Sequence, residues 1–428
     1  MHDPFQGDPH SQMYLATILE DRLGDKVEAE LIDLRGVKKE YALQHIPGCD
    51  IYMHSIYTLD VDEQKEIVRK LREFYPSSKH ISGGPHANIF PEDCQKSFDS
   101  VVVGDAEESI FRVIKDFENN QLKGFYEQQE VIDVNDYPMP SRRFLPKTTV
   151  ASKGMVTLRN KSGYDKLYGT TVLFTRGCPY QCAFCAVHSM RNHNPGIRYR
   201  TAENIEAEVN YLKNEYGIQG LNLLDEIGVP LDKKQAVLRL EALARTGIKW
   251  RGQCRVDGVT PEIAKLLKDS GCIAMGLGVE SVSQRSLDLI NKKIKLQRSK
   301  DTIKLLKEND IETRVYLMLG LPGEPETIVE DTKKFILETD PDVVFLSNFT
   351  IRPGTDVYDN KEKYGIKSVE TDWTKNNHLF GRYGLEVPTL TFEYNCDTPW
   401  GKAPSQEEII KRYMELQGWL RDRNISSL

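Results

Sequence analysis

Long apolar runs are missing from this sequence. The longest aliphatic runs, such as residues 343–346, have the length of a strand, whereas a helix that spans a membrane needs roughly 20 apolar residues. Residues 1–5 contain no cationic segment followed by an apolar stretch, which a signal peptide would require. We therefore expect no membrane span, no signal peptide and a cytoplasmic location.

An excess of basic residues is also missing. The 57 Lys and Arg residues are outnumbered by 64 Asp and Glu residues, so the formal net charge is -7. A nucleic-acid partner would need clustered Lys and Arg to neutralise phosphates, and we expect no such partner. The rest is ordinary for a globular protein, because 39% of the 428 residues are hydrophobic and 28% are charged, enough for two or three domains.

The distribution of the cysteines does not indicate a disulfide framework. Eight cysteines in a chain of 428 residues without a secretion signal are not the pattern of a small secreted domain. Three of them lie within eight residues of one another. The other five, Cys49, Cys94, Cys254, Cys272 and Cys396, are scattered. Of these, Cys272 lies in an apolar run and is predicted to belong to the core.

The first 120 residues alternate short apolar runs with helical patterns. Helices are predicted over residues 11–23, 62–74 and 107–118, and strands over 29–34, 50–55, 80–82 and 100–103. Strands separated by helices are typical of a parallel sheet, so residues 1–120 are predicted to form a doubly wound, Rossmann-like α/β domain. Residues 121–165 are rich in proline and lack a sustained periodicity, and we expect a connector there.

Regular alternation of strands and helices resumes in residues 166–365. Strands are predicted over 170–175, 219–224, 248–254, 273–279, 312–319 and 343–350, with helices near 203–216, 232–246, 261–270, 297–309 and 325–338. Six units are fewer than the eight of a closed barrel, so we expect a partial, open (β/α)6 barrel of the TIM type. Residues 366–428 end in an amphipathic helix at about 406–421. This C-terminal region, with Trp373, His378, Trp400 and Trp419, is a candidate cover for the active site.

The most informative motif is FTRGCPYQCAFC at residues 174–185. It places Cys178, Cys182 and Cys185 in a C-x3-C-x2-C spacing on the loop after the first predicted barrel strand. Thiolates this close together can hold one iron–sulfur cubane, and Gly177 and Pro179 shape the tight loop that this requires. Only three ligands are local, so one iron is left for something other than cysteine. The motif therefore predicts a reactive 4Fe–4S cluster.

Two other sites could use the same cysteines. A zinc ion would need a fourth ligand, which His188 or His193 could supply. A conventional ferredoxin site would need a fourth cysteine. The position of the loop at the carboxyl end of a barrel strand, where barrel active sites assemble, favours the reactive cluster.

With this motif, the sequence resembles the radical S-adenosylmethionine (SAM) superfamily over about residues 135–360. The resemblance implies an enzyme whose open iron binds the amino and carboxylate groups of SAM. One electron from the reduced cluster then breaks the sulfur–C5′ bond and gives a 5′-deoxyadenosyl radical, which abstracts a hydrogen from the substrate. The cofactor carries the difficult chemistry, and the protein orients it.

The resemblance also implies a SAM site at the ends of the first barrel strands. Phe184 takes the aromatic position beside the cluster and the adenine. Asp225 and Glu226 match the segment that contacts the SAM amino group, although the family's Gly-Gly-Glu is absent, so that backbone carbonyls are expected to make the contact. Arg255 is a candidate partner for the SAM carboxylate, since a guanidinium can bind a carboxylate bidentately.

The later strand ends continue this resemblance. Glu280 and Ser281 match the fourth-strand motif, in which the acid accepts hydrogen bonds from the ribose hydroxyls. Gly320 and Gly323 match the fifth-strand glycine motif, which lets the backbone approach the adenine, and Ile351 belongs to the loop after the sixth strand. Each match has an ordinary alternative by itself, a common turn or a surface acid. Their order along successive strand ends is what supports the SAM site.

Residues 1–120 resemble the cobalamin-binding domain of a large radical SAM subclass. Gly83 and Gly84 follow a predicted strand, where glycines would let the cobalamin tail lie against the sheet edge, and Ser55 ends the strand before. His10, in Asp8-Pro9-His10, stands where some cobalamin domains carry a cobalt ligand, but it is more simply a solvated loop residue. The apolar strand that usually precedes this loop is not found.

The resemblance favours a cobalamin-dependent radical SAM methyltransferase that acts at an unactivated carbon of a small molecule or peptide. A low-potential donor such as a flavodoxin or ferredoxin would reduce the cluster. One alternative is a radical SAM cyclase, oxidase or rearrangement enzyme without cobalamin. The other is a nonenzymatic iron–sulfur protein, which would not need the SAM motifs. The substrate, the catalytic residues and the oligomeric state cannot be assigned from the sequence.

Overall fold

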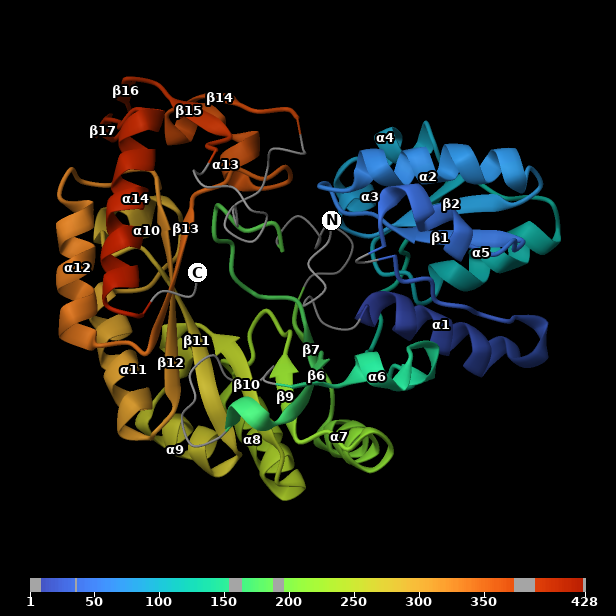
Figure 1. The fold of residues 1–428 in the computed structure, drawn as a ribbon, viewed down its shortest axis with the longest axis horizontal. Helices are drawn as coiled ribbons and strands as arrows, with labels where there is room; N and C mark the ends of the chain where they lie inside the picture. The colour runs from blue at the N-terminus through green and yellow to red at the C-terminus, as the bar shows by residue number, and fades with distance from the viewer. Residues whose placement is uncertain (1–8, 35–36, 154–163, 188–195, 373–388, 426–428) are drawn as a thin grey trace. The chain divides into compact units, whose positions relative to one another are not determined.

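Two compact units make up the chain in the computed structural model, which describes residues 9–34, 37–153, 164–187, 196–372 and 389–425 (Figure 1). Unit 1 comprises residues 1–147 and 187–196, and unit 2 comprises residues 148–186 and 197–428. The division falls within residues 121–165, the expected connector. Each unit has its own parallel sheet and its own core.

Unit 1 is built on four parallel strands in the order β1-β2-β3-β4. These are β1 (Ile51–Ser55), β2 (Lys79–Gly83), β3 (Ser100–Val103) and β4 (Phe125–Glu127). Its helices are α1 (His10–Leu23), α2 (Val61–Phe74), α3 (Pro85–Ile89), α4 (Pro91–Gln95) and α5 (Ser109–Glu118), with short 3-10 turns η1 (Gly24–Lys26), η2 (Lys39–His45) and η3 (Arg142–Phe144). The predicted parallel α/β sheet is confirmed.

One strand predicted in unit 1 is wrong. Residues 29–34 form no strand, and no described strand pairs with them. Ile32 and Leu34 instead pack against a small cluster of Ile46, Tyr52 and Leu71. Their apolar pattern therefore reflects side-chain packing, which looks the same in a sequence as the buried face of a strand. Strand β4 was missed because it is only three residues long.

Unit 2 contains a seven-stranded sheet in the order β13-β12-β11-β10-β9-β6-β5. Its parallel strands are β6 (Tyr168–Val172), β9 (Gly220–Leu223), β10 (Lys249–Cys254), β11 (Cys272–Glu280), β12 (Glu312–Leu319) and β13 (Val343–Asn348), and β5 (Ser152–Lys153) is antiparallel to β6. The two end strands do not pair with each other, so the predicted partial, open barrel of six βα units is confirmed.

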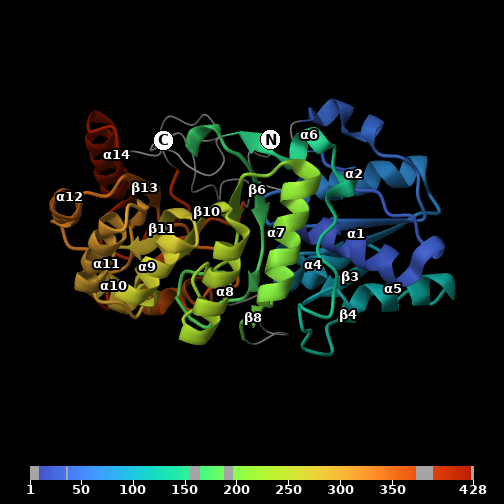
Figure 2. The same ribbon diagram turned by 90° about the horizontal axis from the view of Figure 1, so that it is seen from below.

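Helices follow the outer face of this sheet in chain order (Figures 1 and 2). They are α7 (Ala202–Tyr216), α8 (Lys233–Thr246), α9 (Pro261–Asp269), α11 (Leu296–Glu308) and α12 (Ile328–Thr339). The chain fixes their ends locally: the Thr201 side chain caps the first turn of α7, and Gly217 ends that helix in the left-handed conformation. Aliphatic residues of the sheet and of these helices form one core, in which Cys272 is buried as predicted.

The remaining elements of unit 2 surround the strand ends and the C-terminal region. They are α6 (Lys147–Val150, which begins at the last residue of unit 1), η4 (Tyr164–Lys166), β7 (Thr175–Arg176), β8 (Arg198–Tyr199), η6 (Val256–Gly258), α10 (Gln284–Leu289), α13 (Asp356–Asp359), η7 (Lys361–Tyr364), β14 (Ile366–Val369), β15 (Phe392–Tyr394), β16 (Asp397–Thr398), β17 (Gly401–Lys402) and α14 (Gln406–Asp422). Trp400 is buried in a second cluster, and Trp419 packs against the main core. Trp373 and His378 lie outside the described residues.

None of the helices in the described part of the chain combines the length and the apolar character that crossing a membrane requires.

Candidate functional site

The cysteine motif lies on the loop that follows the first parallel strand of unit 2. Gly177 takes a positive φ of 86°, which lets the chain turn sharply before Cys178. The backbone N–H of Ala183 donates to Ile290 O at 2.9 Å, and Asn291 Nδ2 donates to Gln181 O at 2.7 Å. The loop is therefore held by the segment after strand β11, which is far away in the sequence.

All three thiols of the motif are free of disulfides. Cys182 is buried, and Cys178 and Cys185 are half-buried. Within the described ranges, no three His, Cys, Asp or Glu side chains approach as the ligands of a single metal ion would. His188 and His193, the candidate fourth ligands of a zinc site, lie outside the described residues.

A buried arginine lies against the central cysteine of the motif. Arg255, the residue after β10, has its Nη1 3.8 Å from Cys182 Sγ. Its guanidinium stacks on the Tyr180 ring, with 3.5 Å between Cζ and the ring centroid. It also donates to both Asp257 oxygens, at 3.0 to 3.3 Å, and to Lys292 O at 2.8 Å. Arg255 thus faces the cysteine loop and already has protein partners on most of its donors.

Glu280 at the end of β11 forms a buried ion pair with Lys292. Lys292 Nζ lies 2.8 Å from Glu280 Oε1, and both side chains are largely buried. The backbone of Glu280 has a φ of 68°, and the register of β11 against β12 shifts between Gly278 and Glu280. A Cβ on Gly278 would lie 2.6 Å from Glu280 Oε1, so the missing side chain leaves the room that the carboxylate occupies. Ser281 follows and is buried.

Phe184 lies between the cysteines and this ion pair. It is half-buried, packs against the second cluster of unit 2, and has Lys292 Nζ 5.9 Å from its ring centroid. The aromatic ring, the thiols and the Glu280–Lys292 pair are therefore parts of one site. Lys292 was missed by the sequence reasoning, because Asn291-Lys292-Lys293 is indistinguishable from a solvated basic turn without the fold.

Asp225 and Glu226 are adjacent in sequence but have different surroundings. Asp225 is fully buried, accepts from Phe174 N at 2.8 Å and forms an ion pair with Arg239 at 2.6 Å. The same guanidinium donates to the hydroxyl of Thr175 and to a backbone carbonyl. The Asp225–Arg239 pair therefore ties the segment between β6 and β7, and β7 itself, to α8. Arg239 was also missed, since its partner is 14 residues away.

Glu226 points toward the cysteine loop. Burial raises the pKa of its carboxyl, the nearby Asp225 charge raises it further, and a hydrogen bond from the backbone of Gly177 opposes the shift. Among the described residues, its Oε2 atom is buried and has no hydrogen-bond partner. A buried acceptor without a partner is destabilising, so this oxygen is suited to a donor from a bound molecule.

The glycine turn after β12 is fastened by a buried acid and by the C-terminal region. Gly320 N and Leu321 N donate to the two Glu324 oxygens, both at 3.0 Å. Tyr394 Oη donates to Gly320 O at 2.8 Å. Burial raises the pKa of Glu324 to about 7, although the two N–H donors act in the opposite direction.

The other residues predicted at this end of the sheet also lie near the glycine turn. Gly320 and Gly323 have φ values of 90° and 78°, which favour glycine. A Cβ on Gly323 would lie 2.4 Å from a Leu289 methyl. Ile351, in the loop after β13, is buried in the second cluster with Leu321 and Phe349. The predicted residues at the ends of the fifth and sixth strands thus shape the backbone of the turn, in the case of the glycines, and pack in the second cluster, in the case of Ile351.

In unit 1, the residues predicted to bind cobalamin meet at the carboxyl ends of β1 and β2. Ser55 pairs with Gly83 in the sheet register. Gly84 has a φ of 91°, and a Cβ there would lie 3.0 Å from Ile56 N. Glycine is therefore needed at position 84 because a side chain there would collide with the backbone of Ile56. His10 is a buried residue at the start of α1, and Asp8 lies outside the described residues.

Two histidines are packed on the sheet of unit 1. His54 Nε2 lies 3.1 Å from His80 Nδ1, and the His80 ring stacks on Tyr52 with 5.0 Å between centroids. Burial and, to a smaller extent, the neighbouring His80 lower the pKa of His54 to about 4. Burial and the charge of Arg72 lower the pKa of His80 to about 4. Both rings are therefore neutral at neutral pH.

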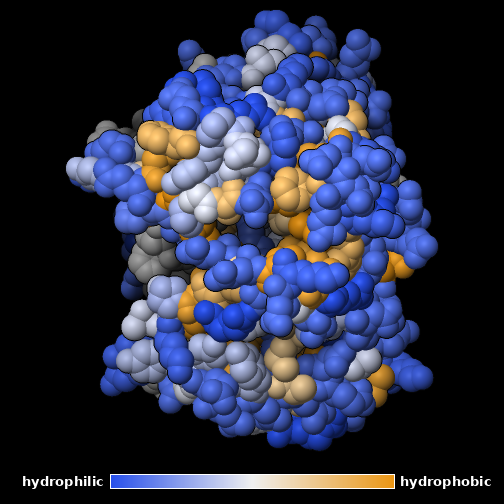
Figure 3. All heavy atoms as spheres, turned by 90° about the vertical axis from the view of Figure 1, so that its right-hand side faces the viewer, coloured by the Kyte–Doolittle hydropathy of each residue, from blue (hydrophilic) through white to orange (hydrophobic). Residues whose placement is uncertain are grey.

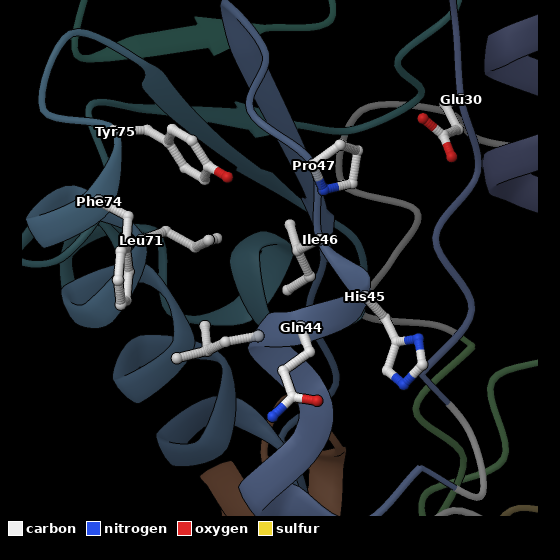
Figure 4. A pocket seen from close by; sticks show the side chains of 9 residues that line it. Glu30, Gln44, His45, Ile46, Pro47, Leu71, Phe74 and Tyr75 are labelled. Carbon is white, nitrogen blue, oxygen red and sulfur yellow. The ribbon is translucent and has the colours of Figure 1, made fainter.

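A separate pocket of about 580 Å³ lies near the start of β1, away from the strand ends that carry Ser55 and Gly83 (Figure 4). It is lined by Glu30, Leu43, Gln44, His45, Ile46, Pro47, Leu71, Phe74 and Tyr75. Figure 3 looks onto unit 1, where apolar side chains form patches around a hollow in a mostly polar face. No predicted site residue lines this pocket.

The sequence of this chain is similar to those of known proteins. A family model described as the Radical SAM superfamily matches residues 172–336. An uncharacterized methyltransferase of Pyrococcus horikoshii is 28% identical over 289 residues, which are 65% of this chain and 62% of that protein. The anaerobic magnesium-protoporphyrin IX monomethyl ester cyclase of Cereibacter sphaeroides is 27% identical, over 72% of this chain and 52% of that protein. The chain thus spans a little over half the length of these relatives.

The fold is shared with a solved structure. The radical SAM methyltransferase TsrM from Kitasatospora setae, with cobalamin and a [4Fe–4S] cluster bound, superimposes with a TM-score of 0.66 at 18% sequence identity. The superposition covers 85% of this chain and 78% of that chain. Residues 172–336 therefore match the Radical SAM superfamily model, and the chain shares its fold with this methyltransferase structure.

Proposed function

We propose that this protein is a radical SAM enzyme with a cobalamin-dependent methyltransferase activity at an unactivated carbon. The observation that carries the proposal is the placement of three cysteines without a disulfide, of the Glu226 oxygen that has no hydrogen-bond partner among the described residues, and of the Glu280–Lys292 pair at the strand ends of the barrel sheet. The methyltransferase relative and the cobalamin-bound structural neighbour support the choice of reaction.

The donor set fits the cofactors that the family implies. Cys178, Cys182 and Cys185 would hold three irons of a 4Fe–4S cluster, and no disulfide occupies them. When bound and reduced, the cluster supplies the electron that cleaves SAM and so generates the 5′-deoxyadenosyl radical. Glu226 would accept a hydrogen bond from the SAM amino group through its unpartnered oxygen.

Other residues of the site would orient SAM and exclude water. Lys292, a buried cation beside the cysteine loop, is a better partner for the SAM carboxylate than Arg255, whose Nε and Nη2 already donate to Asp257 and to the Lys292 carbonyl. Glu280 would accept from the ribose hydroxyls, with Ser281 beside it. Gly320, Gly323, Ile351 and Phe184 would form the walls around the adenine.

In unit 1, we propose that cobalamin lies against the strand ends at Ser55, Gly83 and Gly84, where it would supply the methyl group that is transferred. Ser55, Gly83 and Gly84 carry small side chains or none, and Ser55 pairs with Gly83 at this edge. A low-potential flavodoxin or ferredoxin would reduce the cluster. We place the reaction in the cytoplasm, because free thiols and a reduced cluster need a reducing compartment.

A single anaerobic experiment tests the proposal. Reconstituted protein is incubated with SAM and dithionite, and 5′-deoxyadenosine and S-adenosylhomocysteine are quantified. Both products are expected, because methyl transfer consumes SAM in two roles. The Cys182→Ala variant should lose the roughly four irons of the site and form neither product. Wild-type protein that retains zinc and shows no iron-dependent absorption would refute the cluster.

The second candidate function is radical cyclisation without bound cobalamin, and the cyclase relative favours it. In that case the same incubation yields 5′-deoxyadenosine without S-adenosylhomocysteine. Protein produced with cobalamin should then also lose the cofactor on desalting. Retention of cobalamin together with both products selects the methyltransferase.

A further inference from the structure

We propose that Arg255 raises the reduction potential of the cluster by donating a hydrogen bond from its guanidinium to the Cys182 thiolate. This inference rests on the proposed function, since it requires a cluster on the cysteine motif. Its basis is the 3.8 Å distance between Arg255 Nη1 and Cys182 Sγ, inside a largely buried environment.

Three contacts fix the orientation of the guanidinium. Asp257 accepts from Nε and Nη2, Lys292 O accepts from Nη2, and Tyr180 covers one face of the plane. A planar guanidinium held on one edge and one face presents its remaining donor, Nη1, in a defined direction. That donor faces the sulfur.

The same contacts explain why Arg255 is not available as a bidentate partner for SAM. Two adjacent donors would have to be free to bind a carboxylate side by side. Every pair of adjacent donors in Arg255 includes Nε or Nη2. These two nitrogens already donate to Asp257 and to the Lys292 carbonyl. The sequence alone indicated a SAM contact, and the fold favours a contact with the cluster ligand.

The electrostatic consequence has a definite sign. Reduction adds one electron, and therefore one negative charge, to the cluster and its thiolates, with no bond broken or formed. A cationic hydrogen-bond donor at a ligand sulfur stabilises the reduced state more than the oxidised state. Removal of that donor makes the cluster harder to reduce, whereas removal of the nearby Asp257 charge makes it easier to reduce.

Equilibrium redox titration of the reconstituted protein without SAM tests this, with the reduced cluster followed by its electron paramagnetic resonance signal. In Arg255→Met, the ratio of reduced to oxidised cluster at a fixed potential should fall at least tenfold, a shift of about 59 mV for one electron. Asp257→Asn should shift the ratio in the opposite direction. Lys268→Met, which removes an exposed cation on α9, is the matched control and should leave the ratio unchanged.

A merely structural role of Arg255 would not shift the reduction potential in opposite directions in Arg255→Met and Asp257→Asn. Unchanged potentials, or shifts of the same sign, would overturn the proposal. Arg255→Lys, which keeps the charge but not the planar fork, replaces Arg255→Met if that variant fails to hold iron, and should give a smaller negative shift. If neither variant holds iron, the absence of a positive shift in Asp257→Asn overturns the proposal. A wild-type protein without a cluster would instead refute the proposed function.

Discussion

The two units stabilise their buried polar groups in different ways. In unit 1, His54 and His80 pack against each other, the nearby Asp99 accepts from the backbone N–H of His80, and burial keeps both rings neutral. At the candidate site of unit 2, two buried carboxylates instead form ion pairs, Asp225–Arg239 and Glu280–Lys292. A group buried without a counterion gives up its charge, and a group buried with one keeps it.

The strand ends of the two units differ accordingly. Unit 1 brings the backbone of Gly84 close to that of Ile56, so its edge is shaped by steric fit. Unit 2 places charged side chains around the cysteine loop, so its edge is shaped by charge. Changes in side-chain volume should therefore matter most in unit 1, and changes in charge should matter most in unit 2.

The largest expected effect is the loss of the Asp225–Arg239 pair. Arg239→Met leaves the fully buried Asp225 carboxylate without its counterion, and we expect unit 2 to lose about 3–5 kcal/mol of unfolding free energy. Urea denaturation followed by far-UV circular dichroism measures this. Arg245→Met, which breaks an exposed pair with Glu206, is the matched control and should lose about 0–1 kcal/mol.

The double variant sharpens this prediction. Asp225→Asn combined with Arg239→Met removes both charges, and it should recover part of the lost stability because no isolated charge stays buried. If the Arg239→Met protein is as stable as the Arg245→Met control, water reaches Asp225. That result would contradict the claim that changes in charge matter most in unit 2.

Opposite pH dependences should separate the two units. The pKa of His80 is about 4 in the folded state and 6.5 in the unfolded chain. Between these pH values the unfolded chain therefore binds more protons than the folded state does. Stability of unit 1 should therefore fall as the pH falls through this window, by on the order of 3 kcal/mol for this fully buried ring. His54 acts in the same direction.

Glu324 in unit 2 has the reverse sign. Its folded pKa of about 7 means that the folded state binds more protons between pH 4.5 and 7, so its contribution to stability is lost as the pH rises through that window. Hydrogen exchange of the amides in each unit, followed from pH 4.5 to 7, measures both slopes. His80→Asn should flatten the slope in unit 1 only, and Glu324→Gln that in unit 2 only. Equal slopes in both units would contradict the comparison.

The next effect concerns SAM binding at the charged edge. Glu280→Gln should weaken SAM binding by roughly 1.5–3 kcal/mol, because it loses a charge-assisted hydrogen bond to the ribose. The cluster should remain, since the cysteines are unchanged. Equilibrium dialysis with labelled SAM and iron quantification measure the two properties. Glu330→Gln, on the exposed side of α12, is the control. Unaltered SAM affinity in Glu280→Gln would show that the ribose lies elsewhere.

The smallest expected effect tests the steric edge of unit 1. Gly84→Ala combines a positive φ with a Cβ 3.0 Å from Ile56 N, and we expect a loss of about 1–3 kcal/mol. Gly83→Ala, whose Cβ would meet Val102 only at 3.8 Å, should be tolerated. Thermal unfolding compares the two variants. Cobalamin retention is then better tested in Gly83→Ala, which leaves the unit folded, and equal stability of the two variants would contradict the steric account.

The sequence predicted the framework of this protein well, for a local reason. Apolar periodicity and glycine or threonine at helix ends fix where elements begin and end, so the six barrel strands were placed within a few residues. The cysteine motif is also local, because three thiols within eight residues stay together in any fold of that loop. The segment 29–34 failed because pairing of a strand depends on a partner elsewhere in the chain.

Only the tertiary structure decided the roles of the charged residues. Arg255, Lys292 and Arg239 carry the same charge in the sequence, yet they face Cys182, Glu280 and Asp225 respectively. These partners are 12 to 73 residues apart along the chain, and only the parallel sheet brings its strand ends to one edge. The sequence shows which residues are neighbours along the chain. The direction in which a guanidinium points depends on every group packed around it, which only the tertiary structure shows.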